Sequence, residues 1–136
     1  MSRRSRAREI VIQVLYEDDL NPDRNPGTAD QFLQSRLNND QELVEFARTL
    51  LAGVRKHRTE IDKHLVERAD NWTLERMAVT DRNILRLAIF EMLHREDIPP
   101  VVSINEAVDI AKKFSTHDSG KFVNGILDKI RAEILR

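Results

Sequence analysis

The stretch "TDRNILRLAIFEMLH", residues 80–94, decides the fold class of this chain. Its apolar residues stand on nearly every side of a helix: Ile84, Leu85, Leu87, Ala88, Ile89, Phe90, Met92 and Leu93. A helix that is apolar nearly all round is covered on most sides by other elements. The stretch therefore predicts a central helix, and Glu91 within it predicts a buried carboxylate with a partner such as an arginine.

Helical spacing of apolar residues recurs on both sides of this central helix. Sustained strand-type alternation is missing, so no strand is predicted. Asp40 and Thr80 stand where helix N-caps are expected, and Ser103 and Glu106 have the spacing of a capping box. Apart from a short turn of helix near Thr73, the spacing predicts helices over residues 5–20, 28–37, 40–69, 80–94, 103–114 and from 119 onwards. We expect an all-α fold, a compact bundle of about seven helices.

The length and composition exclude several classes of protein. At 136 residues the chain suits one domain, spanning 1–136, or two small halves that share a core. It has no cysteine, which excludes disulfide bonds and thiolate chemistry. No apolar run is long enough to span a membrane, and the start of the sequence lacks the apolar core of a signal peptide. We therefore expect a cytoplasmic protein that does not bind membranes.

The net charge is only −1, but the charges are unevenly distributed along the chain. The first eight residues, "MSRRSRAR", carry four arginines and no acid, and residues 112–136 carry twice as many basic as acidic side chains. Residues 17–40 are instead rich in acids. Such an arrangement predicts a local anion-binding face on a nearly neutral protein.

The first predicted helix offers residue types that bind single-stranded nucleic acid. Arg6 and Arg8 flank its apolar stripe, each at about 100° from Ala7. Tyr16 lies about 180° from Ala7 and so faces away from the predicted core. A ring beside arginines suits a stacked base whose phosphates are held by charge. The alternative is a frayed, soluble terminus whose tyrosine is covered by another helix.

A second candidate is "KKFSTHDSGKFVNG", residues 112–125, which contains two phenylalanines and two of the four glycines of the chain. Lys121 projects about 160° from Val123, and Phe122 lies about 100° from it, at the edge of the core. Asp118 and Ser119 are suited to cap the following helix, whose free amides attract anions. The alternative is a capped helix start whose small residues allow close packing.

No pattern indicates an enzyme. "GKFVNG" has the glycine spacing of a phosphate-binding loop, but apolar residues follow it in place of the required Lys and Ser/Thr. His57, Glu60 and His64 share one predicted helix face at a spacing that suits a metal, yet no second ligand-bearing helix is evident. We expect no catalytic residue, no cofactor and no metal. Trp72 is expected to pack in the core, and a partner surface is the alternative.

Four stretches together resemble the NusB family of bacterial transcription antitermination factors. They are "RSRAREIVIQVLYE", "NWTLERMAVTDRNILRLAIFEML", "IPPVVSINEAVDIAKKF" and "SGKFVNGILDKI". The resemblance covers nearly the whole chain and implies two antiparallel three-helix halves packed together. It also implies a partner, NusE, the small-subunit ribosomal protein that doubles as an elongation factor. The pair would bind boxA-type single-stranded RNA, so that RNA polymerase with other Nus factors reads through terminators and the rRNA transcript matures.

The resemblance further implies which residues face each partner. The RNA-binding residues would be Arg3, Arg4, Arg6, Arg8, Tyr16, Asp118, Lys121 and Phe122. The NusE-binding residues would be Glu75, Arg76, Asp81, Arg82 and Arg86. Some relatives self-associate through the RNA surface, and the sequence leaves monomer and homodimer open.

Two other functions suit a helical protein of this size. One is a protein–protein scaffold or dimeric module that does not bind RNA. The other is the RNA-targeting domain that precedes the catalytic part of certain rRNA cytosine methyltransferases. Those enzymes need a catalytic cysteine, and the absence of cysteine from this chain disfavours that alternative.

Overall fold

The computed structural model describes residues 3–70 and 72–134, which form seven α-helices and one short 3-10 helix. They are α1 (Arg3–Leu20), α2 (Thr28–Arg36), α3 (Gln41–Lys56), α4 (Arg58–Arg68), η1 (Leu74–Arg76), α5 (Val79–His94), α6 (Pro100–Phe114) and α7 (His117–Ile134). These residues contain no strand, so the prediction of an all-α fold with about seven helices is confirmed. None of these helices is long and apolar enough to cross a membrane.

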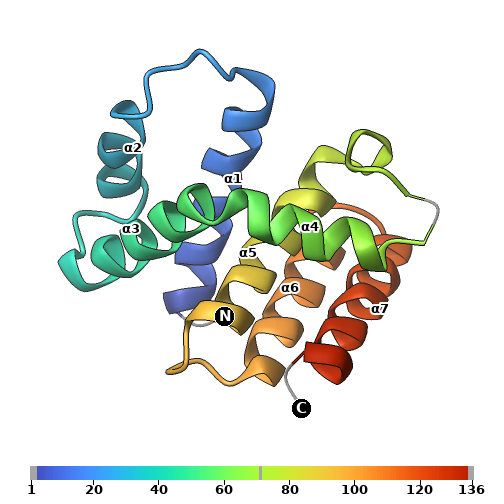
Figure 1. The fold of residues 1–136 in the computed structure, drawn as a ribbon. Helices are drawn as coiled ribbons and strands as arrows, with labels where there is room; N and C mark the ends of the chain where they lie inside the picture. The colour runs from blue at the N-terminus through green and yellow to red at the C-terminus, as the bar shows by residue number, and fades with distance from the viewer. Residues whose placement is uncertain (1–2, 71, 135–136) are drawn as a thin grey trace.

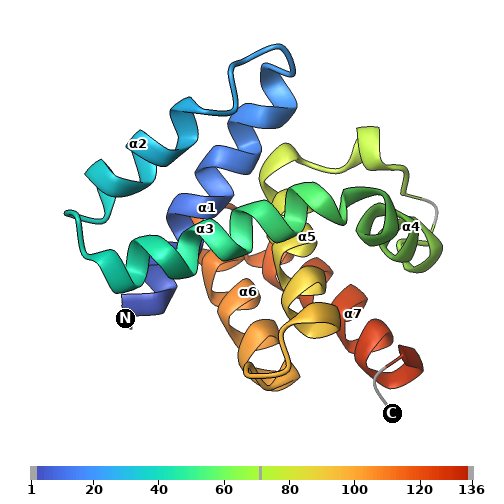
Figure 2. The same cartoon turned by 60° about the vertical axis from the view of Figure 1, so that its left-hand side comes forward.

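The central helix is α5, as its apolar composition predicts (Figure 1). It packs against α1, α3, α4, α6 and α7, and its residues Ile84, Leu85 and Ile89 are almost completely buried. α1, α2 and α3 form one group of helices. α5 itself forms a second group with α6 and α7, and α4 lies across this second group. Figure 2 shows the two groups side by side. The packing of α1 on α5 joins them into one core.

The prediction of one helix over residues 40–69 is wrong at its middle. α3 starts, as predicted, after the N-cap Asp40, whose carboxylate accepts a hydrogen bond from the backbone N–H of Leu43 at 3.3 Å. It ends at Lys56, and α4 continues in a new direction (Figure 2). Residues 55–60 are all polar, so no apolar side chain there packs a continuous helix into the core. Further on, Ile61 and Leu65 are fully buried and fix the new direction of α4.

Four helix starts also differ from the prediction: α1 and α7 each begin two residues early, at Arg3 and His117. α5 begins one residue before Thr80, and α6 begins at Pro100, three residues before Ser103. Proline suits the first turn of a helix, because its φ is already near the helical value and its missing N–H would have no partner there. Ser103 and Glu106 therefore lie inside α6. They bind side chains of other helices instead of forming a capping box.

Gly53 in α3 allows the ring of Phe90 in α5 to approach the helix backbone. A Cβ atom added at Gly53 would overlap that ring, whereas a Cβ atom added at Gly125, in α7, would meet no atom within 4 Å. We expect Gly53→Ala to lower the free energy of unfolding by about 1–3 kcal/mol, because overpacking outweighs the gain in helix propensity. The control, Gly125→Ala, is expected to raise it by about 0.5–1 kcal/mol.

Urea denaturation followed by circular dichroism measures both variants. Equal stabilisation by the two substitutions would show that the Phe90 ring does not pack against the backbone of α3 in the way described.

Candidate nucleic-acid interface

Arg8 lies on the side of α1 that faces α5, and its side chain is buried. The guanidinium donates hydrogen bonds of 2.8–3.2 Å to both carboxylate oxygens of Glu91 and lies 3.4 Å from Glu106. Ser103 donates a further hydrogen bond to Glu91 at 3.1 Å. The predicted arginine partner of Glu91 is thus confirmed. The structure contradicts the expectation that Arg8 contacts RNA, because this side chain is 3% exposed and already paired.

The other three arginines at the start of α1 are exposed. Arg3 pairs with Asp40, the N-cap of α3. Arg4 lies over the ring of Phe46, with its guanidinium carbon 4.3 Å from the ring centroid. Arg6 pairs with no acid in the part of the chain that the structure describes. These guanidinium groups leave N–H donors facing solvent, where they suit phosphate oxygens.

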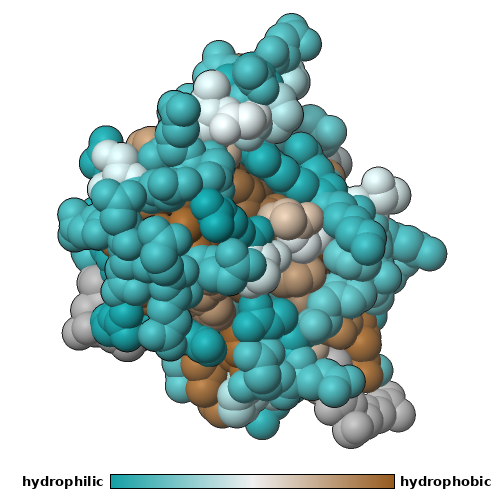
Figure 3. Space-filling view, turned by 90° about the vertical axis from the view of Figure 1, so that its left-hand side faces the viewer, coloured by the Kyte–Doolittle hydropathy of each residue, from teal (hydrophilic) through white to brown (hydrophobic). Residues whose placement is uncertain are grey.

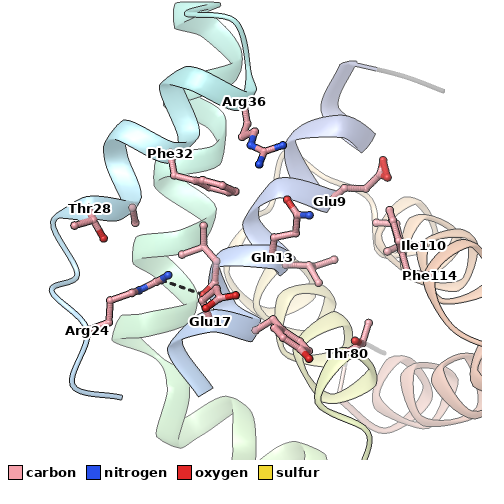
Figure 4. Close-up of a pocket in the computed structure, with 14 residues that line it drawn as sticks. Glu9, Gln13, Glu17, Arg24, Thr28, Phe32, Arg36, Thr80, Ile110 and Phe114 are labelled. Atoms are coloured by element: carbon pink, nitrogen blue, oxygen red, sulfur yellow. Dashed lines mark hydrogen bonds between the residues drawn. The ribbon is translucent and has the colours of Figure 1, made fainter. Parts of the chain in front are cut away.

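Tyr16 lies near the other end of α1, beside a groove of about 700 Å³. Phe32 of α2 and Phe114 of α6 also line this groove, and Arg24 and Arg36 bring positive charge to it (Figure 4). Tyr16 is 37% exposed, so its predicted outward orientation is confirmed. Phe114 is also exposed, at 52%. It is the last residue of α6, where the helix has run past the core.

The groove is not uniformly basic. Figure 4 shows Glu9, Gln13 and Glu17 of α1 along its floor, between α2 and α6. Glu9 is buried and pairs with Lys113 of α6 at 2.9 Å. The groove therefore offers aromatic rings and mixed charge, which suits bases better than a row of phosphates.

A smaller pocket of about 340 Å³ lies where α7 begins. Asp118, Ser119 and Phe122 of α7 line it together with Trp72 and Arg76, which precede α5. The rings of Trp72 and Phe122 meet edge to face, with centroids 5.9 Å apart. Phe122 is half-buried, as predicted for a ring at the edge of the core. Trp72 is 47% exposed, so the expectation that it packs in the core is wrong.

The irregular segment that carries Trp72 explains this exposure. It runs over the outside of the helices, where connecting segments usually lie, and it presents the indole at the surface. In the sequence, Trp72 follows "DN" after a predicted helix and lies outside any apolar stripe, and this position was a signal for its exposure.

The groove and the pocket adjoin at the start of α5, where Thr80 lines the groove and Asp81 lines the pocket. Tyr16 and Phe122 therefore lie at the same end of the molecule, and neither ring is sealed inside. Arg3 lies about 20 Å from Tyr16, because most of α1 separates them. The structure thus places the rings at one end and the terminal arginines at the other, so a ligand that touches both must be extended.

Asp118 and Lys121 are exposed on the first turns of α7, beside the pocket. Lys121 forms no ion pair with any described residue. A different surface appears on the side where α2 and α3 lie: hydrophilic side chains cover most of it, and hydrophobic residues show only in the gaps between them (Figure 3). That side offers no broad apolar patch.

The residues expected to bind NusE are divided between the surface and the interior. Glu75 and Arg76 of η1 are exposed. Asp81 is 7% exposed, and its Oδ2 accepts a hydrogen bond from Ser119 at 3.1 Å. Burial raises the pKa of Asp81, and the hydrogen bond from Ser119 opposes this only in part. The structure contradicts the expectation that Asp81 is a surface contact for a protein.

Two more of the residues expected to bind NusE, Arg82 and Arg86, are held in place by Asp19 near the end of α1. Its carboxylate accepts hydrogen bonds from Arg82 and Asn83 at 2.9 Å and from Arg86 at 2.9 and 3.1 Å. Burial by itself raises the pKa of Asp19, but these hydrogen bonds and the charges of both arginines bring it below the usual range. Arg86 also binds Asp62 and is 3% exposed, which contradicts a role as a surface contact. Arg82 is partly exposed.

One cluster has the residue types of a metal site. Ligand atoms of His57, Glu60 and His94 lie within 4.8 Å of one another, and the two histidine rings are stacked with centroids 4.0 Å apart. The third member is therefore His94 of α5, and His64 instead lies beside Arg68. Glu60 and His94 pair at 2.5 Å, and this contact lowers the pKa of Glu60. The hydrogen bond and the stacking account for the arrangement without an ion.

A model of the NusB family matches residues 5–132 of this chain. The chain belongs to the NusB family. The transcription antitermination protein NusB of Desulforapulum autotrophicum is 45% identical over 136 residues, which cover 96% of this chain and 92% of that protein. The NusB protein of Thermodesulfovibrio yellowstonii is 42% identical over 140 residues, covering 96% and 93% of the two chains.

Solved NusB structures have the same fold. T. maritima NusB superposes with a TM-score of 0.85 at 39% identity, over 98% of this chain and 92% of that chain. A crystal structure of the antitermination factors NusB and NusE in complex with dsRNA matches with a TM-score of 0.86 at 29% identity, over 97% and 98% of the chains. The resemblance to NusB in the sequence and the helical fold that it implies are thus confirmed.

Proposed function

We propose that this NusB family member is a transcription antitermination factor that binds boxA-type leader RNA together with NusE. With RNA polymerase and other Nus factors, the pair promotes read-through and maturation of rRNA transcripts in the cytoplasm. The observation that carries the proposal is a relative of the same fold, 29% identical, in a crystal complex with NusE and dsRNA. Residues 1–136 act as one non-catalytic RNA-binding domain.

Charge and stacking have separate roles in the proposed RNA binding. Exposed cations release counterions from phosphates and so give affinity that is independent of sequence. Partly exposed rings hold unstacked bases, and the Asp118 carboxylate reads a base edge. The residues that supply charge are Arg3, Arg4, Arg6 and Lys121, and those that supply rings are Tyr16 and Phe122.

NusE is proposed to bind beside the RNA, on the segment around Glu75 and Arg76. Behind this segment, Arg82 donates a hydrogen bond of 2.9 Å to the carbonyl oxygen of Leu74 and so holds η1 on α5. Arg86, which is buried, holds α5 against α1 through its pair with Asp19. A partner on this segment would extend the RNA-binding surface, so RNA and NusE should bind cooperatively.

Phe122→Ala and Lys121→Ala are expected to weaken RNA binding in different ways. Loss of a stacking ring costs about 1–3 kcal/mol, so Phe122→Ala should lower the affinity about tenfold at every salt concentration. Loss of one phosphate contact should reduce the slope of log K against log salt by about 1 in Lys121→Ala. Fluorescence anisotropy with a labelled boxA-type RNA, at several salt concentrations, measures both effects.

Lys56→Ala is the matched control, because Lys56 is an exposed lysine at the end of α3, outside the proposed surface. It should change neither the affinity nor the slope. Circular dichroism separates loss of binding from loss of fold. If the unmodified chain bound no RNA, alone or with NusE, the proposal would be overturned in favour of a scaffold without RNA function.

A further inference from the structure

The pocket at the start of α7 contains a buried hydrogen-bond acceptor to which no side chain in the described part of the chain donates. Asp81 is 7% exposed and lines this pocket. Its Oδ2 is bound by Ser119, while its Oδ1 has no hydrogen-bond partner among the described residues. A buried carboxylate oxygen without a donor is destabilising and rare in native proteins. An incoming N–H group at this position would supply the missing hydrogen bond.

The rim of the same pocket carries groups that bind a flat ring. Trp72 exposes 47% of its surface, and Phe122 supports the indole through an edge contact. The guanidinium carbon of Arg76 lies 5.8 Å from the centroid of the Trp72 ring. An indole face stacks on any nucleobase, and a guanidinium beside it suits the phosphate that follows.

These residues come from surfaces that the family resemblance assigns to different partners. Asp118 and Phe122 belong to the expected RNA face, and Arg76 and Asp81 to the expected NusE face, yet all four line one pocket. Its volume of about 340 Å³ falls within the range of sites that enclose small ligands. An aromatic wall, a buried acceptor and a cation on the rim together match one nucleotide.

We infer that this pocket binds one unstacked nucleobase, which stacks on Trp72 and donates its exocyclic amino group to Oδ1 of Asp81. The inference rests on the proposed RNA-binding function and adds a base-specific subsite to it. A carboxylate accepts well from the amino group of cytosine. Uracil has a carbonyl oxygen at the same ring position, which a carboxylate repels. The pocket should therefore prefer cytosine to uracil.

Trp72 is the only tryptophan of the chain, so its fluorescence reports on this pocket without any substitution. Oligocytidylate and oligouridylate of equal length are titrated into the full chain. Trp72 emission and the anisotropy of the end-labelled RNA are recorded together. We expect oligocytidylate to quench Trp72 with the same midpoint as the rise in anisotropy, and to bind about tenfold more tightly than oligouridylate.

Asp81→Asn tests the acceptor directly. An amide offers both an acceptor and a donor, so it accepts from cytosine and donates to uracil, and the preference between the two homopolymers should largely disappear. Asp128→Asn removes an exposed acid of α7 that does not line the pocket, and it should keep the preference. Trp72→Ala should lose about tenfold in affinity, whereas Trp72→Phe keeps a stacking ring and should lose less.

The outcomes separate this inference from the proposed function. RNA that raises anisotropy but leaves Trp72 emission unchanged, with equal affinity for both homopolymers, would overturn the base pocket and leave RNA binding intact. A Trp72 response to NusE but not to RNA would assign the pocket to the protein partner and overturn the inference. Absence of any anisotropy change would overturn both.

Discussion

Replacing Arg8 by methionine is expected to lower the free energy of unfolding by about 3–5 kcal/mol, because it leaves the Glu91 carboxylate buried without its charged partner. Glu91 is 1% exposed, and Arg8 donates to both of its oxygens. Methionine fills much of the space of the arginine stem, so the loss reports on the charge pair rather than on a cavity. Urea denaturation at pH 7, followed by circular dichroism, measures it.

Two controls define the cause of this loss. Arg48→Met removes an arginine that pairs with Asp30 at the surface, and it should leave the denaturation midpoint nearly unchanged. The double variant Arg8→Met with Glu91→Leu removes both buried charges and should return to within about 1 kcal/mol of the unmodified chain. A double variant as unstable as Arg8→Met would show that packing, not the unpaired carboxylate, causes the loss.

Asp19→Asn is the second large effect, with an expected loss of about 3 kcal/mol in the free energy of unfolding. The Asp19 side chain is 2% exposed and pairs with Arg58, Arg82 and Arg86, which come from α4 and α5. Asparagine keeps the shape but not the charge, so these arginines lose their common partner. Arg86 retains Asp62, which places the loss at the lower end of the range for broken buried pairs.

The same carboxylate should make the stability depend on pH. The pKa of Asp19 lies below its usual value, because the hydrogen bonds from Arg82 and Asn83 and the nearby charges outweigh the effect of burial. A carboxylate with a lowered pKa in the folded state stabilises the fold above its unfolded pKa of about 4. This contribution is lost as the pH falls through the folded-state pKa. The unmodified chain should therefore lose more stability below about pH 4 than Asp19→Asn does, and the two curves should converge.

Urea midpoints measured from pH 7 to pH 3 test this convergence. Asp70→Asn is the control, because Asp70 is an exposed acid that pairs with Lys129 and should have little effect at pH 7. Curves that stay parallel down to pH 3 would show that Asp19 contributes nothing specific to the acid sensitivity.

Local features of the sequence predicted much of this fold. The apolar composition of residues 80–94 identified α5 as the central helix, and Asp40 identified the start of α3. Helix periodicity and capping act between residues that are at most a few positions apart, so they are readable without the tertiary structure. The edge position of Phe122 and the need of Glu91 for an arginine follow from the same local patterns.

Contacts between distant segments could not be predicted in this way. Arg6 and Arg8 are displaced by similar angles from the apolar stripe of α1, and only the packing of α1 on α5 buries Arg8 and leaves Arg6 exposed. His94 lies far along the sequence from His57 and Glu60, yet it completes their cluster. The pocket between Trp72 and Phe122 depends on how the segment before α5 crosses the start of α7.

The most direct test of the central claim is the affinity for a labelled boxA-type RNA, measured with and without saturating NusE at several salt concentrations. A cooperative adaptor has a coupling free energy of about 1–3 kcal/mol, so NusE should tighten RNA binding by roughly 5- to 150-fold. The tightening by NusE should persist at high salt, although salt weakens RNA binding both with and without NusE. The reason is that the tightening arises from contacts on an added surface. Equal affinity with and without NusE at every salt concentration would contradict the account.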